Sequence, residues 1–337
     1  MADKIEKGPI KTEDYPISSE GNVDLIIAHE LGRRLSVENF RDVYGDERID
    51  AAIRDQLNIK AGFVEQFKKD VDNAVKDIQD PDLREKEREK VRKAMIRGEL
   101  RNKALETLVR ENIEMGNWFG ENAYAIRTTE YDDLKNGVDV VVEFDSEDGD
   151  KIALSIDVSL KASTVHRKIF RNFLKIKNGG AKVEFFASQI QGSNFKGEIQ
   201  GVIPVAIGID GANADAFFDR QAQMIRLEKS IDVAVDKGLK DTLQKKYDEL
   251  FIEAQNDPIQ LVYINEILAQ VIRIAEELRG DEKNETLFRS AEKLKRIFED
   301  ILEEKKKRGM ELGVLKKDLA YLSIVGAVEM RTKKASA

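Results

Sequence analysis

Short β-strand patterns interrupt a chain that otherwise repeats with helical spacing, and their order constrains the fold most. A helical pattern ends near Trp118, after which strand and helix patterns alternate. The predicted elements are three strands, one helix and two further strands, over residues 123–127, 138–144, 152–160, 163–177, 182–187 and 202–210. The helix is predicted to end at Asn178-Gly179-Gly180, a typical C-terminal signal. The predicted order is therefore α-β-β-β-α-β with one additional strand.

Acidic and basic side chains occupy two of these strands. Asp139 lies at the start of the second strand, and Asp157 lies within the third. Side chains two and four residues apart on a strand point the same way, so Ser159 and Lys161 share a face with Asp157. If the two strands pair as a hairpin, they bring two carboxylates and an ammonium group together. Because carboxylates suit Mg²⁺ and a lysine can stabilise negative charge at phosphorus, the pattern predicts the minimal equipment of a metal-dependent phosphodiesterase.

With these residues in this order of elements, the segment 111–215 resembles the PD-(D/E)XK nuclease superfamily. The resemblance implies a restriction-endonuclease-like αβββαβ core, of α+β or α/β class, between N-terminal and C-terminal helical regions. It also implies that Asp139 and Asp157 bind the metal, Mg²⁺ or Mn²⁺, and that the substrate is nucleic acid, either DNA or RNA. An acidic residue on the first helix often joins such a site, and Glu121 is the first candidate here, followed by Glu114.

The motif lysine is the point at which this sequence departs from the superfamily. Ser159 occupies the position two residues after Asp157, where the motif has lysine. Lys161 lies on the same strand face, about 6–7 Å farther along, and Lys168 on the next helix is the competing candidate. The superfamily contains both migrated lysines and inactive members. Two interpretations therefore stay open: a nuclease, and a catalytically inactive nuclease-fold protein that binds nucleic acid or acts as a structural or oligomerisation module.

Charge is distributed unevenly along the predicted core. The chain as a whole has a formal net charge of −8, which argues against a general nucleic-acid coat. Residues 121–150, however, carry ten acidic and two basic residues, whereas residues 151–200 carry nine basic and three acidic residues. This pattern is typical of a metal site beside a phosphate-binding face, and the alternative is two ordinary solvated surfaces.

The basic helix is predicted to have two distinct faces. Arg167, Lys168 and Arg171 are expected on the side that binds phosphate groups of nucleic acid. The opposite side is expected to be buried and to consist of Ile169, Phe170, Phe173 and Leu174.

The segment before Asp139 contains further polar residues. Asp132 and Asp133 precede Asn136-Gly137, a turn-forming pair, so this segment is predicted to be a hairpin loop that positions Asp139. Either aspartate is an additional candidate metal ligand. Pro204 predicts that the last strand lies at an edge of the sheet or begins to pair after this residue.

Two histidines and no cysteine limit the alternative chemistries. His29-Glu30 lacks a second histidine four residues on, which argues against a zinc protease. His29 is instead expected to be partly buried, and His166 is a candidate phosphate contact or proton shuttle. The absence of cysteine excludes disulfides and thiolate chemistry.

The composition predicts several regions. With 337 residues and 36% charged residues, the chain favours long solvated helices around one smaller core. The expected regions are a disordered tail, an N-terminal helical region, the nuclease-like core and a C-terminal helical bundle, over residues 1–20, 21–110, 111–220 and 221–337. The bundle has heptad-like spacings that could mediate a homodimer. The charged start lacks a signal-peptide pattern and no segment is apolar enough for a membrane span, so a cytoplasmic location is expected.

Overall fold

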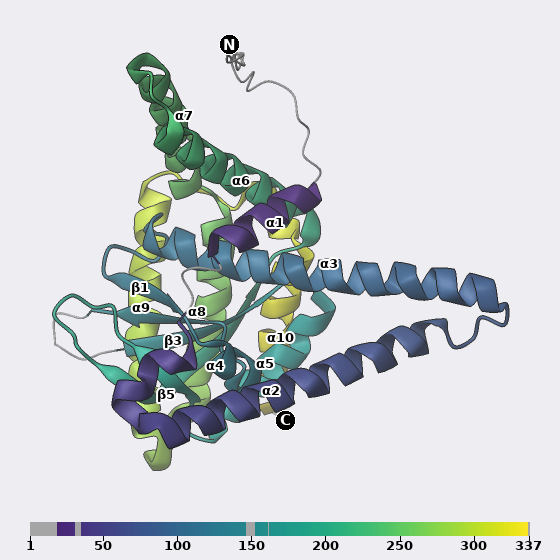
Figure 1. Ribbon diagram of the computed structural model, residues 1–337. Helices are drawn as coiled ribbons and strands as arrows, with labels where there is room; N and C mark the ends of the chain where they lie inside the picture. Colours follow the sequence, from purple (N-terminus) through teal and green to yellow (C-terminus); the bar gives the residue numbers. More distant parts are fainter. Residues whose placement is uncertain (1–18, 31–34, 146–151, 161, 336–337) are drawn as a thin grey trace, which may run out of the picture.

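The computed structural model describes residues 19–30, 35–145, 152–160 and 162–335. It is of mixed α+β class, with a five-stranded sheet flanked by helices (Figure 1). The strands are β1 (Ala123–Arg127), β2 (Val140–Phe144), β3 (Ile152–Ser159), β4 (Ala181–Ala187) and β5 (Lys196–Gly208). The α-helices are α1 (Ser19–Glu30), α2 (Arg41–Val75), α3 (Pro81–Glu114), α4 (Glu130–Asn136), α5 (Ala162–Lys177), α6 (Gly211–Val233), α7 (Lys237–Gln255), α8 (Ile259–Leu278), α9 (Glu285–Lys307) and α10 (Leu319–Ala335). Short 3-10 helices are η1 (Val37–Phe40), η2 (Glu282–Asn284) and η3 (Gly313–Lys317).

The sheet has the strand order β1-β2-β3-β5-β4. β1, β2 and β3 form an antiparallel meander, β3 pairs with β5 in parallel, and β4 pairs with β5 antiparallel. A parallel pair cannot be joined by a tight turn, and the connection from β3 to β5 accordingly passes through α5 and β4. The crossover carries α5 from the end of β3 back across the sheet.

The predicted strands and the basic helix are present, with small changes in their bounds. β1 has the predicted limits, whereas β2 begins at Val140 and β5 begins earlier than predicted, at Lys196. All five residues of β2 are buried, as are seven of the eight residues of β3. Strands covered on both faces read as continuous apolar runs, which explains why their patterns were visible in the sequence.

The N-terminal helices form a long two-helix arm. In Figure 1, α2 and α3 extend away from the sheet and are joined at their far ends. Asp80 caps α3, accepting hydrogen bonds from the backbone N–H groups of Asp82 (2.9 Å) and Leu83 (3.0 Å), with Pro81 in the first turn. The helix continues through Gly98 without a break and ends at Glu114.

A short helix replaces the predicted hairpin loop between β1 and β2. Thr129 caps α4, and its side chain accepts a hydrogen bond from the N–H of Asp132. Gly137 ends the helix in the left-handed conformation with φ 60°, which glycine adopts without strain. The Asn136-Gly137 signal therefore marks a helix C-terminus, and the prediction of a two-strand turn at this point was wrong.

Pro204 lies in an internal strand, contrary to the prediction. Pairing between β5 and β4 extends only to Val202, and Pro204 is the Cα partner of Ser155 on β3. Ile209 donates its N–H to the Ser159 carbonyl on the β3 side, so the alternate positions, including Pro204, direct their backbone groups away from β3. Pro204 thus lies beyond the point at which β4 ends, so its lack of an N–H removes no hydrogen bond between the two strands.

Side chains of α8 complete the hydrogen bonding of β5 beyond Pro204. Gln270 accepts from the Ala206 N–H (2.9 Å) and donates to the Ala206 carbonyl (2.7 Å). Glu266 accepts from the Gly208 N–H at 2.9 Å. Both side chains are buried, and within the described chain the second carboxyl oxygen of Glu266, Oε1, has no hydrogen-bond partner. Burial raises the pKa of Glu266 well above its usual value, because the charged form of the carboxyl loses its hydration.

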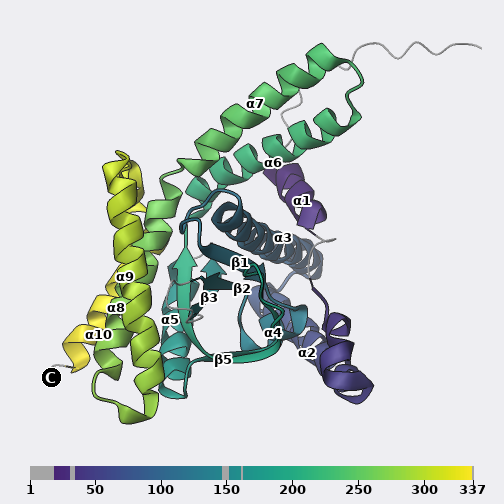
Figure 2. The same cartoon turned by 90° about the vertical axis from the view of Figure 1, so that its left-hand side faces the viewer.

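The C-terminal helices pack within the chain. Figure 2 shows α8, α9 and α10 on one side of the sheet, and α1, α2 and α3 on the other. The heptad-spaced residues of α9 are buried, namely Leu287, Ala291, Leu294, Phe298 and Ile301. These residues therefore pack inside the chain and are not available to a second copy. The homodimer through the C-terminal helices stays a prediction, for which α10 offers the exposed side chains of Leu319 and Leu322. Among the described helices, none combines the length and the apolar character needed to cross a bilayer.

The buried carboxyl of Glu266 generates a prediction about stability. Its folded-state pKa is raised, so its contribution to stability is fully present below the unfolded-state pKa and is lost as the pH rises toward the folded-state value. In the wild type, proton loss from this carboxyl on unfolding should make the unfolding free energy fall by about 1.4 kcal/mol per pH unit above pH 5. The variant Glu266→Gln carries no such proton, so this contribution to the slope should be absent. Urea unfolding of both proteins from pH 5 to pH 9 measures this slope. Parallel profiles for the wild type and the variant would show that Glu266 does not hold a proton in the folded state.

Candidate carboxylate and lysine site

Three elements bring carboxylates together at the start of β2. Glu106 lies on α3, Asp133 on α4, and Asp139 immediately before β2. One carboxylate oxygen from each of the three lies within 4.8 Å of the others. Glu106 and Asp133 are partly exposed, while Asp139 is 8% exposed, so solvent reaches the group from one side. We refer to these three residues as the carboxylate cluster.

Asp157 lies beside this cluster because of the strand register. β2 and β3 pair with Val140 opposite Ile156, and the next position in the same register places Asp139 opposite Asp157. Directly opposed residues of an antiparallel pair have Cβ atoms about 4.5–5.5 Å apart, on the same face of the sheet. A hydrogen bond of 2.9 Å from the Val158 N–H to Oδ2 of Asp139 fixes this arrangement. Asp157 is 8% exposed, the same value as Asp139.

The arrangement is electrostatically unfavourable for Asp139. Burial raises the pKa of Asp139 well above its usual value, and repulsion from Glu106, Asp157 and Asp133 raises it further. The ammonium of Lys168 acts in the opposite direction. A group of this kind favours the binding of a cation, since added positive charge relieves the repulsion among the carboxylates.

Two basic residues of α5 face Asp157. Lys168 forms an ion pair with Asp157 and donates to the Val158 carbonyl at 2.5 Å, and Arg171 lies 3.5 Å from Asp157. Burial opposes the charge on Lys168, but the attraction of Asp157 and Asp139 more than offsets it and raises the pKa of Lys168. The lysine is therefore a charged ammonium at neutral pH.

The structure places the other predicted residues away from this group or leaves them outside the description. Glu121 is exposed in the turn before β1. Glu114 accepts a hydrogen bond from the Ala125 N–H, and its pKa is raised by burial. Ser159 contacts the Thr164 hydroxyl at 2.7 Å, and Lys161 lies outside the described residues. These placements leave Glu106 as the acidic residue that α3, the helix before β1, contributes to the group.

Glu106 was missed in the sequence, although a signal for it exists. It lies on α3 between residues that are completely buried, including Leu105 and Leu108. A carboxylate so close to an apolar helix face indicates a specific partner more strongly than one on a fully charged face. In the structure, Arg127 of β1 is one cationic neighbour of Glu106, with its guanidinium 3.7 Å from the carboxylate.

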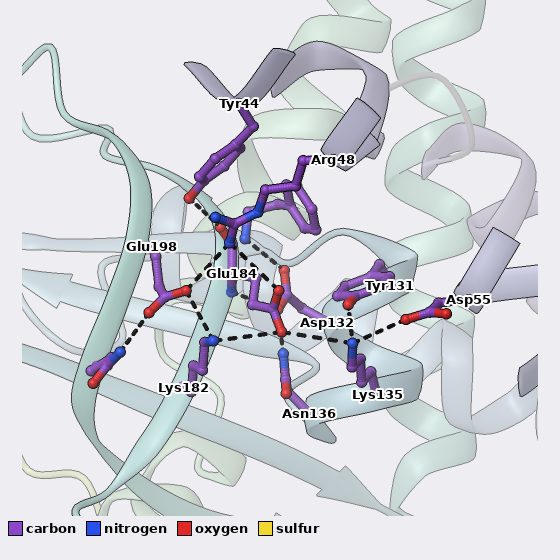
Figure 3. A network of polar contacts seen from close by, with 12 residues as sticks. Tyr44, Arg48, Asp55, Tyr131, Asp132, Lys135, Asn136, Lys182, Glu184 and Glu198 are labelled. Carbon is purple, nitrogen blue, oxygen red and sulfur yellow. Dashed lines mark hydrogen bonds and ion pairs between the residues drawn. The ribbon is translucent and has the colours of Figure 1, made fainter. Parts of the chain in front are cut away.

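Asp132 holds α4 in place and thereby positions Asp133. Figure 3 shows Asp132 between Glu184 and Asn136. Its fully buried carboxylate accepts four hydrogen bonds. Oδ1 accepts from the Glu184 N–H and the Asn136 amide, both at 2.7 Å, and Oδ2 accepts from the Phe185 N–H and the Thr129 hydroxyl, both at 3.0 Å. Asp132 thus joins α4 to the outer strand β4. It is a structural residue, while its neighbour Asp133 belongs to the carboxylate cluster.

Further polar contacts tie α2 and α5 to the same region. Tyr44 of α2 donates to the Glu184 carbonyl at 2.8 Å, and Arg48 lies 3.7 Å from the Glu184 carboxylate (Figure 3). Lys175 of α5 donates to the carbonyls of Asn136 (2.7 Å) and Gly137 (3.0 Å) at the end of α4. α4 is therefore held from β4 on one side and from α5 on the other, which leaves little freedom to the segment that leads into Asp139.

The two histidines lie apart from the carboxylate cluster. His29 is partly buried, as predicted, and its Nε2 lies 3.9 Å from Glu111 and 4.0 Å from Glu228. His166 is exposed on α5.

Comparison with known proteins gives no relative. No protein-family model, no curated protein and no solved structure matches this chain.

The different roles of two adjacent aspartates can be tested by one pair of variants. Asp132→Asn should lower the unfolding free energy by about 2 kcal/mol, because an amide cannot accept hydrogen bonds at both of its positions. Asp133→Asn should leave stability unchanged or raise it, because it removes one of the repelling charges. Thermal unfolding in the presence of EDTA measures both effects. Equal destabilisation by the two substitutions would contradict these assignments.

Proposed function

We propose that this chain is a divergent PD-(D/E)XK protein that hydrolyses phosphodiester bonds of nucleic acid with a divalent metal ion. The order of elements supports the proposal: α3, the meander β1-β2-β3, the crossover helix α5, and β5 parallel to β3. β4 is an additional strand inserted before β5. In this proposal Glu106 of α3 takes the place of the helix carboxylate that the resemblance implies, with Asp139 at the second strand and Asp157 on the third.

The observation that carries the proposal is the carboxylate cluster beside an ion pair of Asp157 with Lys168. Its donor set consists of carboxylate oxygens, which fit Mg²⁺ or Mn²⁺. Asp139, Glu106 and Asp133 would hold the ion, with Asp157 adjacent. When bound, such an ion supplies a water of lowered pKa and neutralises charge that develops at phosphorus.

Lys168 takes the role of the motif lysine in this proposal. Its ammonium is held against Asp157 and the Val158 carbonyl, at the end of β3 where the motif lysine is missing. From this place it can donate to a non-bridging phosphate oxygen and stabilise the charge of the transition state. Arg171, which is 57% exposed, can orient the adjacent phosphate. The assignment of this role to Lys161 stays a competing prediction.

A second candidate function is nucleic-acid binding without hydrolysis. The specific observation in its favour is the direct ion pair between Lys168 and Asp157. An ammonium in this place neutralises part of the charge for which a metal ion would otherwise be needed. In that case α5 would bind phosphate groups and the carboxylate cluster would have no catalytic role.

Cleavage assays on single-stranded and double-stranded DNA and RNA separate the two functions. With Mg²⁺ or Mn²⁺, Asp139→Asn should abolish cleavage, and Lys168→Ala should reduce turnover about 10²-fold or more. Lys161→Ala should have a small effect. Lys177→Ala is the matched control, because Lys177 is exposed on the same helix and its loss should leave turnover unchanged.

The pattern of losses assigns the roles. Loss of turnover in Lys161→Ala with normal turnover in Lys168→Ala would transfer the role to Lys161. Equal cleavage by the wild type and Asp139→Asn would show that the activity comes from another source. Absence of divalent-dependent cleavage on all four substrates would favour the binding function. Circular dichroism of each variant tests whether the fold is retained.

A further inference from the structure

The outer face of α5 combines arginine with exposed apolar side chains. Arg167, Phe170, Arg171 and Leu174 follow one another at spacings of three, one and three residues and are all exposed. Phe170 is 53% exposed and Leu174 is 43% exposed. Both were expected to be buried with Ile169 and Phe173, so that prediction was wrong; we call these four residues the α5 outer face.

The reason for their exposure is that the core side of α5 is already complete. Val165, Ile169, Phe173 and Ile176 are buried in the main hydrophobic core and repeat at intervals of four, four and three residues. Successive residues of a helix are about 100° apart, which turns Phe170 and Leu174 away from this side. Two large apolar side chains between two arginines thus remain on the surface.

The α5 outer face is continuous with the carboxylate and lysine site. Around the helix, Lys168 is followed by Arg171, then Arg167 and Leu174, and then Phe170, at the angles given by about 100° per residue. Lys168 and Arg171 both face Asp157. A phosphate chain that leaves the site across Arg171 and Arg167 therefore brings its bases toward Leu174 and Phe170.

The chemistry of this face distinguishes one class of nucleic acid. Arginines bind the phosphate backbone of any nucleic acid, whereas an exposed aromatic ring can stack only on a base whose face is open. In a duplex those base faces are covered by their neighbours, and in a single strand they are accessible. An exposed phenylalanine beside two arginines is therefore complementary to a single strand.

We propose that the α5 outer face binds single-stranded nucleic acid, with the ring of Phe170 stacked on an unpaired base and Arg167 and Arg171 on the flanking phosphates. This inference rests on the proposed function, since it names the substrate class of the same site. Phe170 would then determine the preference for single strands over duplexes. Arg167 would add affinity for both.

Fluorescence anisotropy with labelled oligonucleotides tests the proposal on the full chain. Single-stranded DNA and RNA and the duplexes of the same sequence are titrated in EDTA, where no metal-dependent cleavage occurs. The wild type should bind a single strand about tenfold or more tightly than the duplex, and Phe170→Ala should remove about tenfold of this affinity while duplex binding stays unchanged. Phe170→Trp should retain the preference.

Two controls separate stacking from charge and from general surface change. Ile252→Ala, at a residue 57% exposed on α7, should have no effect, because the α6–α7 pair projects away from α5 (Figure 1). Arg167→Ala should weaken single-strand and duplex binding alike. It should also reduce the slope of log affinity against log salt concentration by about one, because one counterion fewer is released on binding.

Several results would overturn the inference. They are equal affinity for single strand and duplex, unchanged affinity in Phe170→Ala, or no binding of nucleic acid. A further one is a dimer of the wild type in light scattering that Phe170→Ala converts to a monomer, since the face would then bind a second copy. Binding of single strands that depends on Phe170, without any cleavage, would refute only the hydrolytic function. Cleavage that is indifferent to Phe170 would refute only this inference.

Discussion

The pairing of β3 with a different strand on each side is the constraint from which the arrangement of the site follows. Its antiparallel register with β2 places Asp139 opposite Asp157. Its parallel pairing with β5 requires a crossover, which α5 provides, and this helix begins at the end of β3. Lys168 and Arg171 therefore reach Asp157 from α5, while α3 and α4 bring Glu106 and Asp133 from other directions. A change of one residue in the β2–β3 register would turn these side chains to opposite faces.

The site concentrates like charge in a partly buried place, which costs stability. Asp139 bears most of this cost, because burial and three neighbouring carboxylates all raise its pKa. The chain compensates locally with Lys168, and it fixes α4 with the four hydrogen bonds of Asp132 and with Lys175. Such rigid support around a destabilised group is expected where a site must keep its geometry before a ligand arrives.

Sequence reasoning identified the elements of the core because β2 and β3 are buried on both faces and α5 has a clear apolar side. It predicted that Asp139 and Asp157 lie together, as the β2–β3 register has them, because their two strand patterns are close in sequence and can pair as a hairpin. It could not find Glu106, because α3 meets the strands through tertiary packing that no local period encodes. Pro204 was misplaced for a similar reason, since Gln270 and Glu266 of the distant α8 replace the missing partner strand. The exposure of Phe170 followed from packing already completed by Val165, Ile169, Phe173 and Ile176.

The central claim is that the carboxylate cluster binds a divalent cation, and calorimetric titration with Mn²⁺ tests it without reference to any substrate. The account predicts saturable binding to the wild type and a dissociation constant raised about tenfold or more in Glu106→Gln, since α3 then supplies no charged ligand. Glu121→Gln, at an exposed acidic residue in the turn before β1, should bind Mn²⁺ as the wild type does. Absence of binding, or equal affinity in the wild type and Glu106→Gln, would contradict the account.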